Sequence, residues 1–286
     1  MSFEAPFTTH YFEIPFDKFN EPIYLIPFGD VHRFADNCDE RHWLDFIKWA
    51  ETKERCFFLG MGDYDDFAST SERYALSSAK FHDTTKRYIE DGAKKRTYDF
   101  AEEIKFMKGK LIGLLEGNHH FAFSSGVTST QLMCEFLNCR YLGVSSFIRL
   151  TFRCSKGNHN IDIDIWAHHG LGAGRRAGAS VNKVEDMLRV AEADIYLMGH
   201  DHHKWVDFVH RMRLGRSIKE KTVLNSRKIL LGRTGSFQIG YIPNKSNYVS
   251  SFAMPPTDLG VIKIELTPKR FRGERESVEV DIHASI

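Results

Sequence analysis

Seven of the 14 histidines lie in four short motifs, an eighth directly follows one of them, and a fifth motif contains aspartates. In chain order the motifs are Asp30-Val31-His32, Gly62-Asp63-Tyr64-Asp65-Asp66, Gly117-Asn118-His119-His120, His168-His169-Gly170 and Gly199-His200-Asp201-His202, with His203 directly after the last. Such clustering indicates metal ligation or acid–base chemistry, because imidazole is a common metal ligand and titrates near neutral pH. Histidines with purely structural roles are expected to scatter along the chain.

Each motif alone is a weak signal. A single D-x-H is usually a surface turn with a capping aspartate, and a pair such as His168-His169 is more often one packed and one exposed side chain. Five such motifs, each after a short apolar segment, are hard to explain as five separate accidents. Together they favour a metal site.

The types of candidate ligand indicate which metals the site would bind. Carboxylate, imidazole and amide oxygen suit manganese, iron or zinc, and thiolate is absent from all five motifs. Seven or eight candidate ligands are too many for one ion, whereas two ions sharing a bridging carboxylate would use them. Two metals about 3.5–4 Å apart lower the pKa of a shared water and hold both ends of a phosphoryl displacement.

Apolar segments that end at the motifs predict the strands that position them. These segments are Ile23–Phe28, Cys56–Leu59, Lys110–Leu115, Ile161–Ala167 and Asp194–Met198. Open α/β sheets place their sites just beyond the carboxyl ends of strands. Further strands are expected at Ser146–Cys154, Trp205–Leu214, Lys228–Leu231, Val261–Leu266 and Val278–Ile282. A turn at Gly157-Asn158 would join the strand pair around it into a hairpin.

Helical periodicity predicts helices at Asp39–Lys53, Thr128–Leu137 and Asn182–Ala193. The polar stretch from Thr70 to Lys108 is interpreted as helices with a break near Gly92. The chain thus alternates strand and helix over its first two-thirds and is strand-rich in its last third. We expect one α/β domain over residues 1–286, with either a mixed sheet or two packed sheets.

Composition excludes some classes of protein. The formal net charge is +1, so global charge gives no reason to expect nucleic acid or an anionic membrane as partner. Five scattered cysteines suit reduced, partly buried thiols. The first residues do not resemble a signal peptide, and no stretch approaches the roughly 20 apolar residues that span a bilayer. We therefore expect a cytoplasmic protein without a membrane partner.

The order D-x-H, G-D-x-x-D, G-N-H, a later His and G-H-x-H resembles the calcineurin-like metallophosphoesterases, over residues 29 to 202. The resemblance implies a four-layer α/β sandwich: two packed mixed β-sheets flanked by helices, with metals at the strand ends. Carried over residue by residue, the implied ligands are Asp30, His32 and His202 for one metal, Asp63 as the bridge, and Asn118, His200 and either His168 or His169 for the other metal.

The resemblance also implies a catalytic residue and one departure. His169 is favoured over His168, because it directly precedes Gly170 as the ligand does in many family members. His119 would be the general acid near the leaving group, or would hold a phosphate oxygen. His120 stands where the family usually has Asp or Glu, an acid that orients the preceding histidine. This departure puts the strength of His119 as an acid in doubt.

Other residues are candidates for contact with substrate. Arg33, Arg175 and Arg176 are predicted to bind phosphate, with a solvated loop as the alternative for the arginine pair. Tyr64 and His203 are weaker candidates for substrate contact, and Asp66 is expected to support a ligand. The segment 204–233 contains nine Lys and Arg against two acidic residues, which suits either a nucleic-acid contact or an edge strand guarded by charge.

The sequence therefore predicts hydrolysis of a phosphate ester by a metal-bridging hydroxide. A phosphodiesterase acting on a nucleic acid or nucleotide is the first choice, and a phosphomonoesterase or protein phosphatase is the alternative. A non-catalytic binding scaffold of the same fold is a third hypothesis. Two divalent cations are expected, with manganese as the first choice and zinc, iron and nickel as alternatives. The sequence does not predict the oligomeric state.

Overall fold

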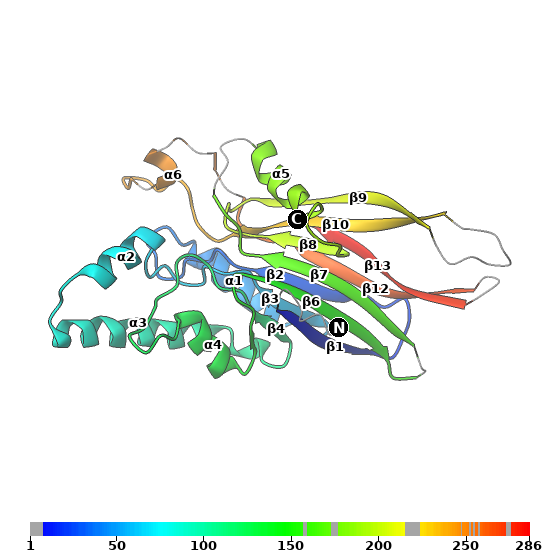
Figure 1. The fold of residues 1–286 in the computed structure, drawn as a ribbon, viewed down its shortest axis with the longest axis horizontal. Coiled ribbons are helices and arrows are strands. Elements are labelled where there is room, and N and C mark those ends of the chain that lie inside the picture. The colour runs from blue at the N-terminus through cyan, green and yellow to red at the C-terminus, as the bar shows by residue number, and fades with distance from the viewer. Residues whose placement is uncertain are drawn as a thin grey trace, which may run out of the picture.

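The computed structural model describes residues 8–156, 159–172, 177–214, 224–246, 248–251, 253, 255–256, 258–272 and 276–286. Two mixed β-sheets form its centre (Figure 1). The first has the order β1-β6-β7-β8-β10-β11, with β9 paired to β10. Its strands are β1 (Thr9–Phe16), β6 (Ser145–Cys154), β7 (Asn160–His168), β8 (Ile195–Met198), β9 (Lys204–Leu214), β10 (Leu224–Ser236) and β11 (Gly260–Val261).

The second sheet has the order β13-β12-β2-β3-β4-β5. Its strands are β2 (Ile23–Phe28), β3 (Cys56–Gly60), β4 (Leu111–Leu114), β5 (Arg140–Tyr141), β12 (Lys263–Arg272) and β13 (Glu276–Ser285). The four strands β2 to β5 are parallel neighbours, whereas β12 pairs antiparallel with both β2 and β13. The parallel strands β2, β3 and β4 therefore end at one common edge.

Some helices cover the outer faces of the two sheets, and others project away from them (Figure 1). The helices are α1 (Glu40–Glu51), α2 (Thr70–Ser78), α3 (Asp83–Glu103), a 3₁₀ turn (Lys105–Met107), α4 (Ser129–Leu137), α5 (Ala177–Met187) and α6 (Tyr248–Ser251). Helices α1, α3 and α4 pack on the second sheet, with Trp43 and Phe100 fully buried there. Helix α5 packs on the first sheet through Val184 and Met187.

A third apolar cluster fills the space between the two sheets and includes Leu25, Ile112 and Ile163. The layers are thus helix, sheet, sheet, helix, so the predicted architecture of two packed mixed sheets flanked by helices is confirmed. Local signals explain the helix starts. Asp39 caps α1 by accepting from the backbone N–H of His42, which satisfies one of the free amides of the first turn.

Three sequence predictions differ from the structure. Strand β1 was not predicted, although its inward Ile14 and Phe16 alternate with outward residues as a strand requires. The predicted break near Gly92 is wrong: α3 continues through it, and the break falls at 79–82 instead. Gly92 is exposed without close neighbours, so the packing of the rest of α3 overrides its low helix propensity. Helix α5 begins and ends about five residues earlier than expected.

The described part of the chain contains no helix that is both long and apolar enough to cross a membrane. All five cysteines are unpaired, and three of them are buried. This agrees with the predicted partly buried thiols. The predicted turn at Gly157-Asn158 lies outside the described residues, but the two strands it would join are antiparallel partners as expected.

Candidate metal centre

All five motifs follow strand ends, and the fold brings them together where the two sheets meet. Strands β2, β3 and β4 of the second sheet lead into three motifs, and strands β7 and β8 of the first sheet lead into the other two. Backbone hydrogen bonds join the first two loops: Asp30 N–H donates to the carbonyl of Gly62 at 2.9 Å, and His32 N–H donates to that of Asp63 at 3.0 Å.

Five of the candidate ligands have a left-handed backbone. The φ angles are 47° at Asp30, 47° at His32, 50° at Asp63, 73° at His200 and 63° at His202. Non-glycine residues rarely adopt this conformation, which costs about 1–3 kcal/mol each and concentrates at functional sites. The tight turns have a clear effect, since each one redirects a side chain from the strand end toward a common point.

Glycine is required at two positions beside these side chains. A Cβ at Gly117 would overlap the carboxylate of Asp63, and a Cβ at Gly62 would overlap the ring of His169. Gly62 also has a φ of 101°, which disfavours any other residue. These two glycines let the second and third motifs approach each other closely.

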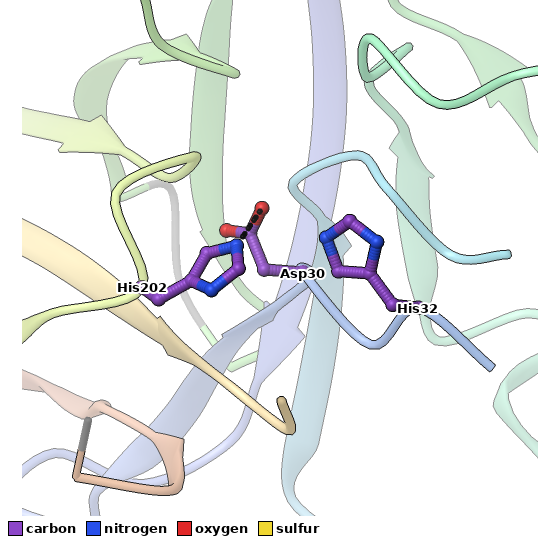
Figure 2. Close-up of side chains that lie close together, drawn as sticks. All are labelled: Asp30, His32 and His202. Carbon is purple, nitrogen blue, oxygen red and sulfur yellow. Dashed lines mark ion pairs between the residues drawn. The ribbon is translucent and has the colours of Figure 1, made fainter. Parts of the chain in front are cut away.

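The first ligand group consists of Asp30, His32 and His202, whose donor atoms lie within 4.8 Å of one another. Figure 2 shows the three side chains directed at a shared space, with His202 Nε2 3.8 Å from Asp30 Oδ1. Asp30 is fully buried and His32 is 2% exposed. Among the described residues, Asp30 Oδ1 and both ring nitrogens of His32 have no hydrogen-bond partner. Buried polar atoms without partners are costly, and a cation held by these atoms would remove that cost.

The second group consists of Asp63, His169 and His200, again with donor atoms within 4.8 Å. His169 Nε2 lies 3.3 Å from Asp63 Oδ2 and 2.9 Å from Asn118 Oδ1. The other ring nitrogen of His169 lies 2.8 Å from the carbonyl oxygen of Met61. A proton on that nitrogen fixes the ring, so that Nε2 faces the site, as is usual for metal-binding histidines.

Asp63 lies between the two groups. Its Oδ2 atom is 3.8 Å from His32 Nε2 in the first group and 3.3 Å from His169 Nε2 in the second. Its Oδ1 atom accepts a hydrogen bond from the backbone N–H of His119 at 2.8 Å. The carboxylate is 3% exposed. This placement fits the bridging position that two cations would share.

The electrostatics fit cation binding at His200, His202 and Asp63, whereas the nearby carboxylates raise the pKa of His169 to about 9, so a cation there would displace a proton. Burial lowers the pKa of His200 to about 4 and that of His202 to about 3, so both imidazoles are neutral near pH 7. Metal ligation requires the unprotonated ring. Burial alone would raise the pKa of Asp63, but the adjacent His169 and His32 lower it far below its usual value. Asp63 is therefore charged and available as a ligand.

His119 has a carboxylate partner that its own motif lacks. Its Nδ1 forms a short hydrogen bond with Asp66 Oδ1, and its ring centre lies 4.7 Å from that of His32. His120, at the position of the usual acid, turns its Nδ1 to the carbonyl of Gly117 at 2.8 Å instead. The second motif thus provides the carboxylate contact to His119 that the third motif lacks.

The structure also separates the paired histidines. His168 Nδ1 accepts a hydrogen bond from the N–H of Gly170 at 2.7 Å, and His168 belongs to neither ligand group. The alternation along β7 explains this: Ile163, Ile165 and His169 face the space between the sheets, whereas His168 falls on the other face. The same alternation of apolar residues is visible in the sequence, and it indicates that His169, not His168, faces the space between the sheets.

Several expected substrate contacts lie elsewhere. Arg33 is 8% exposed, and its guanidinium binds Glu103 at 3.0 Å and Glu40 at 2.9 Å, so it is already neutralised. Tyr64 is a core residue, 2% exposed, whose hydroxyl donates to the carbonyl of Leu115. The hypothesis of substrate contact is therefore wrong for Tyr64 and disfavoured for Arg33. His203 contacts its neighbour Asp201: its backbone N–H donates to Asp201 Oδ1 at 3.3 Å, and its ring Nδ1 lies 3.8 Å from the same oxygen. Arg175 and Arg176 lie outside the described residues.

Supporting residues from distant elements hold the motif loops, and sequence reasoning missed them. From α3, Arg96 forms an ion pair with Asp65, and Glu103 pairs with Arg33. Arg233 on β10 is 1% exposed and donates to the carbonyl of Gly199 at 2.8 Å. These pairs join positions 31 to 70 residues apart, so no local pattern identifies them.

The basic segment 204–233 is largely engaged within the chain. Lys204 pairs with Asp258, Arg227 pairs with Asp194, and Lys228 donates to a backbone carbonyl. Strand β9, which pairs only with β10, is an edge strand. Arg216, Lys219 and Lys221 lie outside the described residues. The nucleic-acid contact expected here remains a prediction.

No protein-family model matches the chain, and no curated protein was found to be similar to it. Vps29 from Entamoeba histolytica in complex with Zn²⁺ is a similar solved structure, with 10% identity, 92% of this chain and 99% of that chain covered, and a TM-score of 0.35. A conserved uncharacterized protein of Streptococcus pneumoniae, described as a predicted phosphoesterase, is 12% identical. The match covers 91% of this chain and 99% of that chain, with a TM-score of 0.34. GAP50 of Plasmodium is 11% identical, and the match covers 86% of this chain and 81% of that chain with a TM-score of 0.37. With TM-scores below 0.5, these structures support no conclusion about the site.

Proposed function

We propose that the protein is a dinuclear metal-dependent phosphoesterase of the calcineurin-like type. One observation supports this above all: Asp63 Oδ2 lies within 4 Å of a histidine nitrogen of each ligand group, at 3.8 Å from His32 and 3.3 Å from His169. Two groups of imidazoles and carboxylates around one shared carboxylate form a donor set for two divalent cations, with manganese as the first choice. Such cations lower the pKa of a bound water and neutralise charge on the phosphate oxygens.

The chain's own residues would complete the reaction. A water oxygen, after losing one proton to solvent, forms a bond to phosphorus, and the bond from phosphorus to the leaving oxygen breaks. His119 donates a proton to that leaving oxygen, which otherwise departs as an alkoxide. The Asp66 carboxylate on the other ring nitrogen holds the imidazole in position and stabilises its protonated form.

A phosphodiester is the substrate that the charges favour. A diester has one negative charge, whereas a monoester near neutral pH has nearly two, so a monoester requires more cationic partners. Two arginines that contact the motif loops are already paired with carboxylates, Arg33 with Glu103 and Arg96 with Asp65. Neither of these two guanidinium groups is therefore free to bind a second phosphate charge.

Metal content and turnover together test the proposal. Wild type should bind two metals per chain after manganese loading and should hydrolyse bis(p-nitrophenyl) phosphate faster than p-nitrophenyl phosphate. Asp63→Asn should reduce bound metal well below two and abolish turnover, because a neutral amide bridges two cations poorly. Asp45→Asn is the matched control, since this carboxylate lies exposed on α1. Two bound metals with no turnover of any ester would instead support the binding-scaffold hypothesis.

A further inference from the structure

An apolar groove with a volume of 410 Å³ lies between α2, the start of α3 and the loop after the third motif. Its walls consist largely of the side chains of Leu76, Phe81, Ile89, Phe121 and Phe123. Phe121 and Phe123 pack against each other with ring centres 4.9 Å apart. The volume falls in the range of small-molecule pockets, about 300–1,000 Å³. Planar rings on several sides suit a planar unsaturated ligand.

The groove adjoins the loop that carries Asn118 and His119. Asn118 and His119 begin the loop whose Phe121 lines the groove, and two residues of chain span at most about 7 Å. Arg73, at the groove, donates to the carbonyl oxygen of Asn118. Phe67 N–H donates to the carbonyl of His119 at 3.2 Å, and its ring packs edge-on against Phe121 at 5.9 Å. A ligand in the groove would therefore lie beside His119.

The surface around the groove is basic and aromatic. Residues 73–96 include seven Lys and Arg against three Asp and Glu, although the whole chain has a net charge of only +1. Lys80 and Lys86 are exposed and, within the described ranges, form no ion pair. Phe81 is 37% exposed and Tyr88 is 83% exposed. Cations that follow a backbone, interleaved with aromatic rings that stack bases, are typical of surfaces that bind single-stranded nucleic acid.

We propose that this groove receives a nucleobase of a single-stranded oligonucleotide, next to the phosphodiester at the metal centre. The proposal rests on the proposed function, because the link to His119 is what places the base beside the scissile phosphate. Rings stack any base, so binding would depend little on sequence. A base can enter only when it is unpaired, so duplexes would bind poorly. Lys80 and Lys86 would contact phosphates that flank the base.

This location differs from the basic segment at 204–233. In Figure 1, α2 and α3 lie at one end of the molecule, whereas the β9–β10 hairpin extends toward the other end. The hairpin's described cations are mostly engaged with neighbouring groups, as Arg227 is with Asp194. The helical end combines unpaired lysines, rings and a groove next to the site, whereas the described part of the hairpin does not.

Binding of fluorescein-labelled hexathymidylate, measured by anisotropy in EDTA, tests the groove without metal or turnover. Wild type should bind the single strand and bind a duplex of equal length far more weakly. Phe81→Ala should weaken binding about 10- to 100-fold, the range for loss of one base–aromatic stack. Phe81→Tyr should restore binding, and Phe81→Leu should not. Phe271→Ala is the matched control, since Phe271 is 49% exposed on β12.

Charge variants decide between the two ends of the molecule. Lys80→Gln with Lys86→Gln should weaken binding and flatten the plot of log affinity against log salt by about 0.7 per lost phosphate contact. Arg211→Gln with Arg213→Gln removes the same charge from β9 and should change neither quantity. The opposite pattern would overturn the proposal, as would absent binding in wild type, equal loss in Phe271→Ala, or equal affinity for duplex.

The outcome is separable from that of the proposed function. If metal-loaded wild type hydrolyses the aryl diester but does not bind the oligonucleotide, only the nucleobase groove is refuted. If it binds the oligonucleotide but hydrolyses no ester, only the phosphoesterase function is refuted. Thermal unfolding of each variant shows whether a loss of binding reflects a loss of fold.

Discussion

Replacing Asp66 with asparagine tests the role assigned to His119. The substitution keeps the shape of the side chain and removes the negative charge from the short hydrogen bond to His119 Nδ1. The protonated imidazole, which is the form that donates a proton, then loses its charged partner. The backbone and the ligand groups around Asp63 stay in place, so the change acts on the acid and leaves the metals bound.

The size of the effect follows from the exposure of the pair. A hydrogen bond to a charged group contributes about 1.5–3 kcal/mol. The side chains of His119 and Asp66 are 23% and 31% exposed, so solvent screening favours the lower half of that range. We therefore expect Asp66→Asn to slow kcat/KM about 10- to 30-fold for a diester with an alkoxide leaving group. A p-nitrophenyl ester, whose leaving group hardly needs a proton, should slow by a few-fold at most.

A double-variant cycle completes this test. His119→Ala should slow the alkyl ester by about 10²–10⁴-fold, and adding Asp66→Asn should slow it little further, because Asp66 acts through His119. His120→Asp, which restores the usual acid of the motif, should leave the contrast between esters nearly unchanged. Asp36→Asn is the control, since this side chain is 85% exposed.

The assay compares steady-state rates on the two esters, with metal content measured for each variant. Metal content matters because Asp66 Oδ1 also lies 3.6 Å from His32 Nδ1. Equal slowing of both esters with both metals bound would refute the general-acid reasoning and assign His119 to phosphate positioning. A double variant much slower than His119→Ala alone would show that Asp66 acts independently.

Three further predictions concern ligands and stability. His169→Ala should lose one of two metals by elemental analysis, whereas His168→Ala should retain both; the reverse would show that the wrong member of the pair is assigned. Arg96→Ala should lower the free energy of unfolding in urea by about 1–3 kcal/mol, because it leaves a buried carboxylate unpaired. Adding manganese to EDTA-treated protein should raise the free energy of unfolding by about 2.7 kcal/mol per metal site at 100 times that site's dissociation constant, and an unchanged melting temperature would count against a metal site.

The sequence predicted the positions of the candidate ligands because each follows a short apolar strand. Strand ends such as Phe28 and Met198 are visible as changes from apolar to polar residues, and the fold places those ends together. The two-sheet architecture followed from the family resemblance rather than from periodicity, which left a single mixed sheet open. The alternation along β7 also contains the information that separates His168 from His169.

Contacts between distant segments could not be predicted from local patterns. Asp66 and His119 are 53 residues apart in the sequence, so no local pattern links them. From the sequence alone, the presence of His120 in place of the usual acid therefore suggested that His119 had no carboxylate partner. The polar stretch from Thr70 to Lys108 predicted helices without indicating what they contact. In the structure Arg96 and Glu103 turn toward the motif loops, which depends on how α3 packs across the second sheet.

These supports bear on how the site is formed. Left-handed backbone at ligands such as Asp30 and His200 costs about 1–3 kcal/mol each and persists only where the surroundings fix it. Here protein groups do so: Arg233 binds the carbonyl next to His200, and the His200 N–H donates to Asp30 Oδ2 at 2.8 Å. Protein groups therefore hold the loop that carries His200 against Asp30. Cations would meet a preorganised site, so most of their binding energy would appear as affinity rather than being spent on ordering the loops.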